Sequence, residues 1–72
     1  MSNKEIVAKC NALARRFYAM HGCHVEAGYR FDDAEHPHEM SMWNMAVAAF
    51  DSIADIDVES ALAQFLEDGE VI

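Results

Sequence analysis

The first third of the chain has apolar residues at intervals of four and three, which is the spacing of one face of an α-helix. These residues are Ile6, Cys10, Leu13, Phe17 and Met20, with Val7 and Ala14 widening the stripe. Ser2 and Glu5 form the pattern of a capping box, and Gly22 stands where a helix C-cap belongs. The pattern therefore predicts a helix over residues 3–21.

The period of the pattern changes to two after this helix. Apolar or aromatic residues then occupy every second position, namely Cys23, Val25, Ala27, Tyr29 and Phe31. Such alternation is typical of an extended segment with one face on the core. Because the sequence offers no second run for it to pair with, we expect an extended connector that lies across the helices. A short strand that pairs with a second copy of the chain is the alternative.

Two further helices are predicted in the second half of the chain. Pro37 suits the first position of a helix, and the apolar stripe behind it predicts a helix over residues 37–54. A third helix is expected over residues 58–68, with Asp57 as its N-cap and Gly69 as its stop. Its expected buried stripe is Val58, Ala61, Leu62, Phe65 and Leu66. The expected fold is all-α, a small three-helix domain with an extended connector between its first two helices.

The size of the chain bears on what it can do. It has 72 residues, of which 53% are hydrophobic and 25% charged, so we expect one folded domain. A domain this small buries only about 60% of the surface that its unfolded chain exposes, and an enclosed catalytic cleft would consume the core that stability requires. Acid–base catalysis by carboxylate pairs normally needs such a cleft. We therefore expect no enzyme activity and no cofactor.

Charge is distributed unevenly along the chain, whose net charge is −8. All five Lys and Arg residues lie among the first 30 positions, and none occurs from Phe31 to Ile72. The acidic half repels phosphate backbones and anionic lipid, so neither nucleic acid nor a membrane is an expected partner. A basic protein surface is the complementary partner.

Most acids of this half surround the N-termini of the second and third helices, where the helix dipole stabilises negative charge. Glu67, Asp68 and Glu70 instead crowd the negative end of the third helix. Asp51 lies within the second helix without a cationic neighbour three or four positions away. These four acids are the predicted contacts with a basic partner.

The second helix is more apolar than one neighbouring helix can cover. Core packing is the default role of its methionines. If the neighbouring helices cover Trp43, Phe50 and Ile53, one apolar ridge remains exposed. That ridge consists of Met42, Met45 and Ala49. We expect it to form a two-fold interface, so a homodimer is predicted, and a structural homo-oligomer with no other partner is an alternative.

A group of side chains that can ligate zinc lies close together in the sequence: His21, Cys23, His24, His36 and His38. Structural zinc takes four ligands in tetrahedral geometry, usually presented in pairs on a turn. The pairs here are poor, because His24 directly follows Cys23 and the chain has no Cys-x2-Cys motif. We expect structural roles for these residues, and a small metal-binding module is a further alternative.

The N-terminal sequence carries Lys4, Glu5 and Lys9 where a signal peptide needs an apolar run. The longest fully apolar stretch runs from Met45 to Phe50, which is too short to span a membrane. These features favour a soluble protein of the cytoplasm.

Four segments of the chain resemble a known group of proteins. They are Gly28-Tyr29-Arg30-Phe31-Asp32, His36-Pro37-His38-Glu39, Trp43-Asn44-Met45-Ala46 and Asp57-Val58-Glu59-Ser60-Ala61-Leu62. Their order is similar to that in short, uncharacterised helical accessory proteins of tailed phages and prophages, over residues 17–66. The resemblance implies an accessory protein made inside a bacterial host cell, and many small acidic proteins of this kind inhibit a host enzyme, including defence nucleases. The sequence thus predicts a non-enzymatic interaction protein that binds and inhibits a basic, nucleic-acid-binding host protein.

Overall fold

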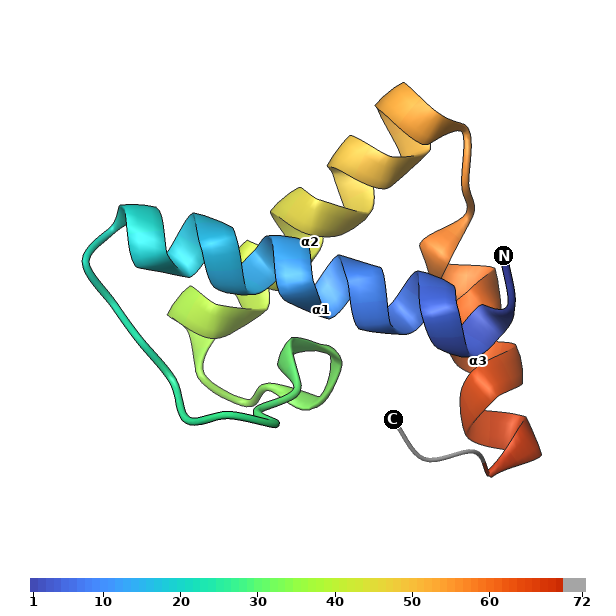
Figure 1. Cartoon of the computed structure of the whole chain (residues 1–72), viewed down its shortest axis with the longest axis horizontal. Coiled ribbons are helices and arrows are strands. Elements are labelled where there is room, and N and C mark those ends of the chain that lie inside the picture. Colours follow the sequence, from blue (N-terminus) through green and yellow to red (C-terminus); the bar gives the residue numbers. More distant parts are fainter. Residues whose placement is uncertain (70–72) are drawn as a thin grey trace.

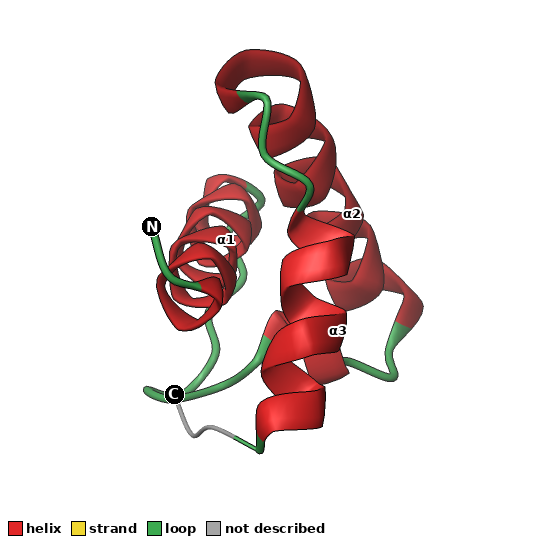
Figure 2. Cartoon of the chain, turned by 90° about the vertical axis from the view of Figure 1, so that its right-hand side faces the viewer, coloured by secondary structure: helices red, strands yellow, loops and turns green. Residues whose placement is uncertain are grey.

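The computed structural model describes residues 1–69, in which the chain forms three α-helices and two short helical segments. α1 spans Asn3–Met20, α2 spans Pro37–Ala49 and α3 spans Val58–Asp68. η1 is a 3-10 turn over Phe31–Asp33, and η2 is a π-helical turn over Phe50–Ala54 that continues α2. α1 crosses the molecule in Figure 1, and Figure 2 shows it nearly along its axis, beside α2 and α3. The all-α, three-helix prediction is confirmed.

The helix boundaries follow the caps that the sequence contains. Ser2 Oγ accepts a hydrogen bond from the backbone N–H of Glu5 at 3.1 Å, as the capping box predicts. α1 ends at Met20 with His21 as its C-cap, one residue before the predicted end. α2 begins at Pro37, as expected from the fixed backbone angle of proline. Local sequence therefore marks where α1 and α2 begin and, within one residue, where α1 ends.

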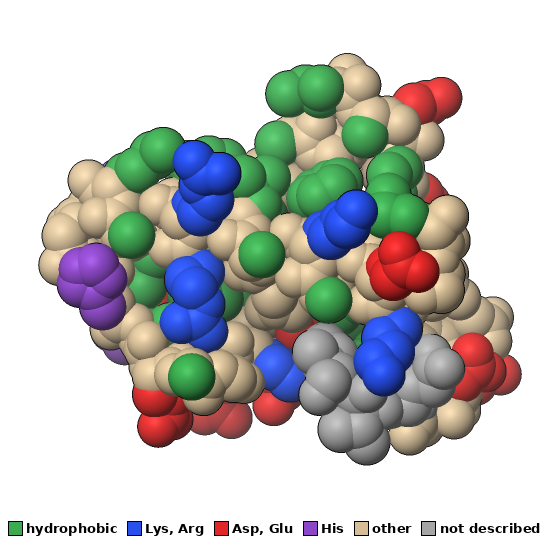
Figure 3. Space-filling model, in the orientation of Figure 1, with side chains coloured by type: hydrophobic (Ala, Val, Ile, Leu, Met, Phe, Trp, Pro, Cys, Tyr) green, Lys and Arg blue, Asp and Glu red, His purple; other side chains and the backbone are tan. Residues whose placement is uncertain are grey.

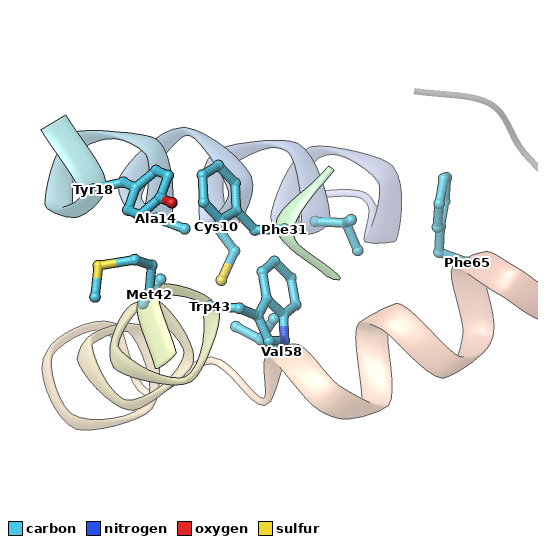
Figure 4. Close-up of a cluster of buried hydrophobic side chains, with 10 residues drawn as sticks. Cys10, Ala14, Tyr18, Phe31, Met42, Trp43, Val58 and Phe65 are labelled. Carbon is cyan, nitrogen blue, oxygen red and sulfur yellow. The ribbon is translucent and has the colours of Figure 1, made fainter. Parts of the chain in front are cut away.

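The core lies between α1 on one side and α2 and α3 on the other, as the close-up in Figure 4 shows. It consists of Val7, Cys10, Ala14 and Tyr18 from α1, Phe31 from η1, Met42, Trp43 and Ala46 from α2, and Val58 and Phe65 from α3. Full burial of a large apolar side chain contributes about 1.5–3 kcal/mol, so this cluster supplies most of the driving force for folding.

The buried stripes of α1 and α3 differ from the predicted ones. Met20 was expected in the core but is 73% exposed, and Leu66 of α3 is 57% exposed. The buried residues of α1 are instead Val7, Cys10, Ala14 and Tyr18, which recur at intervals of three and four. A broad apolar band contains more than one line of residues with helical spacing, and only the packing partners decide which line faces the core.

Arg15 holds the connector between α1 and η1 in place. Its guanidinium donates hydrogen bonds to the backbone carbonyls of Val25 at 3.2 Å and Glu26 at 3.1 Å, and approaches that of Tyr29 at 3.5 Å. The connector thus lies across the helices, as predicted. Residues 1–69 of the single chain contain no strand, and a strand that pairs with a second copy stays a prediction.

Hydrogen bonds join η1 to α1, and a cation–π contact of Arg30, the residue before η1, reaches α3. Asn11 Oδ1 accepts the backbone N–H of Phe31 at 2.5 Å, and Asn11 Nδ2 donates to Asp32 Oδ1 at 2.8 Å. The side chain of Asp32 is only 2% exposed and is paired with Arg30 Nη2 at 2.5 Å. Arg30 lies over the ring of Phe65, 5.5 Å from its centre. Asp32 was one of the acids expected to surround the N-terminus of α2, but its bonds to Asn11 and Arg30 hold it at the edge of the core instead.

The end of α2 departs from the regular helix that the sequence predicted. η2 widens the helix to a π turn and ends at Asp55, which has a left-handed backbone with φ of 56°. Figure 1 shows this end rising clear of α1 and α3. Ile53 is 86% exposed there, so the expectation that neighbouring helices cover it is wrong. No helix within residues 1–69 is long and apolar enough to cross a membrane.

Candidate functional site

The acids predicted to contact a partner do not form a single group. Asp51 is exposed on η2, whereas Glu67 and Asp68 are exposed in the last turn of α3. A rise of about 1.5 Å per residue places the last turn of α3 some 12–15 Å along the helix from its beginning, which lies beside Asp51. Glu70 lies outside the described residues. The described acids that were predicted to contact a basic partner therefore lie at two separate places on the surface.

Asp51 contributes to an acidic hollow between α2 and the beginning of α3. The hollow has a volume of about 350 Å³ and is lined by Asn44, Val47, Ala48, Asp51, Asp57, Val58 and Glu59. Its carboxylates come from η2, from the residue before α3 and from the first turn of α3. None of the described residues that line it is Lys or Arg. We call this feature the α2–α3 hollow.

Asp57 is held in a fixed position at the edge of the α2–α3 hollow. Its carboxylate accepts hydrogen bonds from the backbone N–H of Ser60 at 3.1 Å and from the Ser60 hydroxyl at 2.8 Å. These bonds, the backbone one first, lower the pKa of Asp57 below its usual value. The carboxylate is therefore ionised at neutral pH, and its charge cannot swing away from the hollow without losing the cap of α3.

Asp57 and Glu59 were not among the predicted partner contacts, because helix capping already explained their charge. The sequence contains only an indirect sign of their second role. Asp51 and Asp57 lie on either side of the break between two predicted helices, and a tight reversal of the chain at that break brings them together. The reversal depends on η2, which periodicity did not predict.

The zinc-ligating side chains of the metal alternative have other partners. His36 Nδ1 accepts the backbone N–H of His38 at 3.3 Å and so caps α2, while the Cys23 thiol approaches the carbonyl of His21 at 3.8 Å. The ring of His38 packs edge-on against that of His21, with centres 5.8 Å apart, and His24 is exposed. Within residues 1–69, no three His, Cys, Asp or Glu side chains are arranged to hold a metal ion. The structure therefore gives the metal alternative no assembled site.

A tyrosine–carboxylate cluster, which the sequence pattern did not reveal, joins the connector to both long helices. Tyr18 Oη donates to Glu39 Oε2 at 3.2 Å, and Tyr29 Oη donates to the other oxygen of the same carboxylate. The bond to Glu39, together with burial, raises the pKa of Tyr29 to about 12. Burial and the same carboxylate raise the pKa of Tyr18. Both hydroxyls keep their protons at neutral pH, so they act as structural donors and not as general bases.

The predicted oligomer ridge is only partly exposed. Met42 is 3% exposed and belongs to the core, so its assignment to a surface ridge is wrong. Met45 is 45% exposed and Ala49 is half-buried. Met42 packs inward because α1 crosses α2 on that side, next to Tyr18 in Figure 4. Ile53 takes its place as the exposed apolar side chain.

Comparisons with known proteins find no match to this chain among family models, curated proteins or solved structures.

Proposed function

We propose that the protein is a non-enzymatic binding module that recognises a basic protein surface through the α2–α3 hollow. The observation that carries this proposal is the grouping of Asp51, Asp57 and Glu59 around one concavity. Three carboxylates around a concavity attract cations, and their field also accelerates the encounter with a basic partner.

The shape and lining of the hollow favour a long cationic side chain as its occupant. Val47 and Ala48 supply apolar surface for the methylene stem of a lysine or arginine, and the carboxylates at the edge receive its charged head. A carboxylate that binds arginine can accept two parallel N–H bonds, which adds geometric specificity. Asp57 is suited to this role because its position and ionised state are already secured by Ser60.

The resemblance to phage and prophage proteins supports a bacterial protein as the partner. A surface that binds nucleic acid is rich in Lys and Arg, and carboxylates placed on it occupy the positions of phosphates. Binding of this module would therefore block the partner's access to nucleic acid. The expected location is the cytoplasm of the host cell.

The test compares two variants that change the net charge equally. Asp51→Asn/Glu59→Gln removes two charges from the α2–α3 hollow, whereas Glu67→Gln/Asp68→Asn removes two from the end of α3. Each immobilised protein is used to capture partners from a bacterial lysate at low and at high salt. We expect the wild type and the α3 variant to retain a specific basic protein that high salt releases, and the hollow variant to lose it.

Two results would contradict the proposal. Equal retention by the hollow variant and the α3 variant would show that net charge, and not the hollow, determines binding. Loss of the partner only in the α3 variant would move the site to Glu67 and Asp68, as the sequence first predicted.

A further inference from the structure

A second hollow lies between α1 and the connector, and it shares no lining residue with the α2–α3 hollow. Its volume is about 200 Å³. Ala8, Ala12 and Arg15 line it from α1, and Gly28, Tyr29 and Arg30 line it from the connector. We call this feature the α1–connector hollow.

The hollow is open because three of its lining residues have a small side chain or none. Ala8 and Ala12 lie one turn apart on α1. Gly28 has a φ of 85°, and a Cβ added at this position would meet no atom within 4 Å. A positive φ of this kind favours glycine. The chain thus leaves a space here that longer side chains would fill.

The guanidinium of Arg15 is fixed in position but keeps its positive charge. Its Nη1 and Nη2 atoms donate to the carbonyl of Val25 at 3.2 Å and to that of Glu26 at 3.1 Å. Carbonyls are neutral, and among residues 1–69 no carboxylate forms an ion pair with Arg15. Its Nε–H bonds to none of these residues. Arg15 therefore retains both a net charge and a donor for a ligand.

Arg30 supplies a second guanidinium that is held in place. Its Nε and Nη2 atoms donate to Asp32, and the group lies over the ring of Phe65. Its Nη1 atom bonds to none of residues 1–69, so two further N–H groups remain for a ligand.

Other cations lie beside the hollow. Lys9 and Arg16 are three and four positions from Ala12, so they are its neighbours on the surface of α1, and both are exposed. Glu5 is the only acid of α1. Figure 3 shows Lys and Arg side chains spread over this face of the molecule. Positive charge therefore gathers around one hollow in a chain whose net charge is −8.

We propose that the α1–connector hollow binds the phosphate group of a small phosphorylated molecule. The planar guanidinium presents its donors in a fork that matches phosphate oxygens. A tetrahedral phosphate has oxygens on several sides and can accept from Arg15 and Arg30 together, whereas a carboxylate has two oxygens in one plane. The ring of Tyr29 and the methyl groups of Ala8 and Ala12 supply apolar surface for the rest of the molecule.

The charge of the whole chain favours a small ligand over nucleic acid. Charges farther apart than about 8 Å are largely screened at physiological ionic strength, so a single phosphate responds mainly to the cations around the hollow. A nucleic acid would extend over the acids of the other half of the chain and be repelled by them. The volume of about 200 Å³ is also below the usual range for ligand pockets, about 300–1,000 Å³, so the expected ligand is compact.

The first experiment titrates the isotopically labelled wild type with phenyl phosphate at constant ionic strength and follows it by NMR. We expect saturable shifts of the Arg15 and Arg30 Nε–H signals and of the Gly28 amide, with a Kd below about 5 mM. Inorganic phosphate should compete for the same site. Phenol, which lacks the phosphate, should leave these signals unchanged, and benzoate should bind at least about fivefold more weakly than phenyl phosphate.

The second experiment compares two variants with the same change of charge on the same helix. Ala12→Glu places a carboxylate at the hollow, where it repels phosphate and pairs with the neighbouring cations. Ala19→Glu is the matched control, because Ala19 is exposed on α1 and does not line the hollow. We expect the Kd for phenyl phosphate to rise about tenfold or more for Ala12→Glu and less than about threefold for Ala19→Glu. Circular dichroism verifies that both variants stay helical.

Each outcome bears on the proposal. Absence of saturable shifts in the wild type up to about 20 mM phenyl phosphate overturns it, whether or not the variants fold. Equal weakening by Ala12→Glu and Ala19→Glu overturns the location of the site. Benzoate that binds as tightly as phenyl phosphate overturns the preference for phosphate. The capture of a basic partner depends on other residues, Asp51 and Glu59, so either proposal can fail while the other holds.

Discussion

Replacing Asn11 by alanine is expected to destabilise the protein strongly, because one amide serves two groups of η1. Its carbonyl oxygen accepts the backbone N–H of Phe31 at 2.5 Å, and its amino group donates to Asp32 at 2.8 Å. The side chain of Asp32 is 2% exposed, so water has little access to it in place of Asn11. Arg30 remains as a second partner of that carboxylate.

The expected loss follows from the two bonds. A hydrogen bond to a charged group contributes about 1.5–3 kcal/mol, and a buried N–H left without a partner costs about 1–3 kcal/mol. Arg30 still neutralises Asp32, so the two contributions are not lost in full and we expect a total loss of about 2–4 kcal/mol. A domain of this size has a free energy of unfolding of about 4–11 kcal/mol in all. Asn11→Ala should therefore remove a large fraction of it.

Urea unfolding, followed by the fluorescence of the buried Trp43 and by far-UV circular dichroism, measures this loss. The matched control is Gln64→Ala, since Gln64 Nε2 also donates to a carboxylate, that of Asp68, at 3.0 Å. That pair is exposed, so its loss should cost less than about 0.5 kcal/mol.

Two results would refute this reasoning. One is a loss for Asn11→Ala no greater than that for Gln64→Ala. The other is additivity of Asn11→Ala and Asp32→Ala in a double-mutant cycle, because bonded side chains should show a coupling energy of about 0.5–3 kcal/mol.

Three further outcomes are expected from burial and pKa. Met42→Ala should lower the free energy of unfolding by about 2–5 kcal/mol, and Met45→Ala by less than about 1 kcal/mol; equal losses in urea unfolding would contradict the placement of Met42 in the core. In the folded protein at pH 8, iodoacetamide should modify Cys23 and spare Cys10, because burial raises the pKa of the Cys10 thiol to about 12; mass spectrometry of digested protein detects either adduct. Between pH 10 and 12 stability should fall, because the folded pKa of Tyr29, about 12, exceeds its ordinary value of 10.0, so the tyrosine–carboxylate bond contributes fully below pH 10 and is lost as the proton leaves. Tyr29→Phe should make this alkaline loss shallower, and an unchanged slope in urea titrations at several pH values would contradict the contribution of that hydroxyl.

Local sequence alone determined the number and order of the helices within the described residues and the residue at which each begins. Ser2, Pro37 and Asp57 mark the three helix starts, and each acts through atoms within three residues of itself. Apolar spacing indicated which segments are helical, whereas the basic partner that the uneven charge suggests stays a prediction. Helix caps and apolar spacing involve residues that are close in the sequence, and they do not depend on how the helices pack. They can therefore be predicted without a tertiary structure.

Tertiary structure alone decided which side chains the surface presents. Met42 and Ile53 are both apolar members of one long helical segment, yet Met42 lies under α1 and Ile53 stands free where η2 projects. Asp51 joins Asp57 and Glu59 only because the chain reverses after η2, and Asp32 is buried only because Asn11 and Arg30 meet it there. Burial and charge clustering depend on the crossing of helices and on the direction of one turn. Periodicity specifies a helix face, but only the neighbours of that face determine whether it is core or surface.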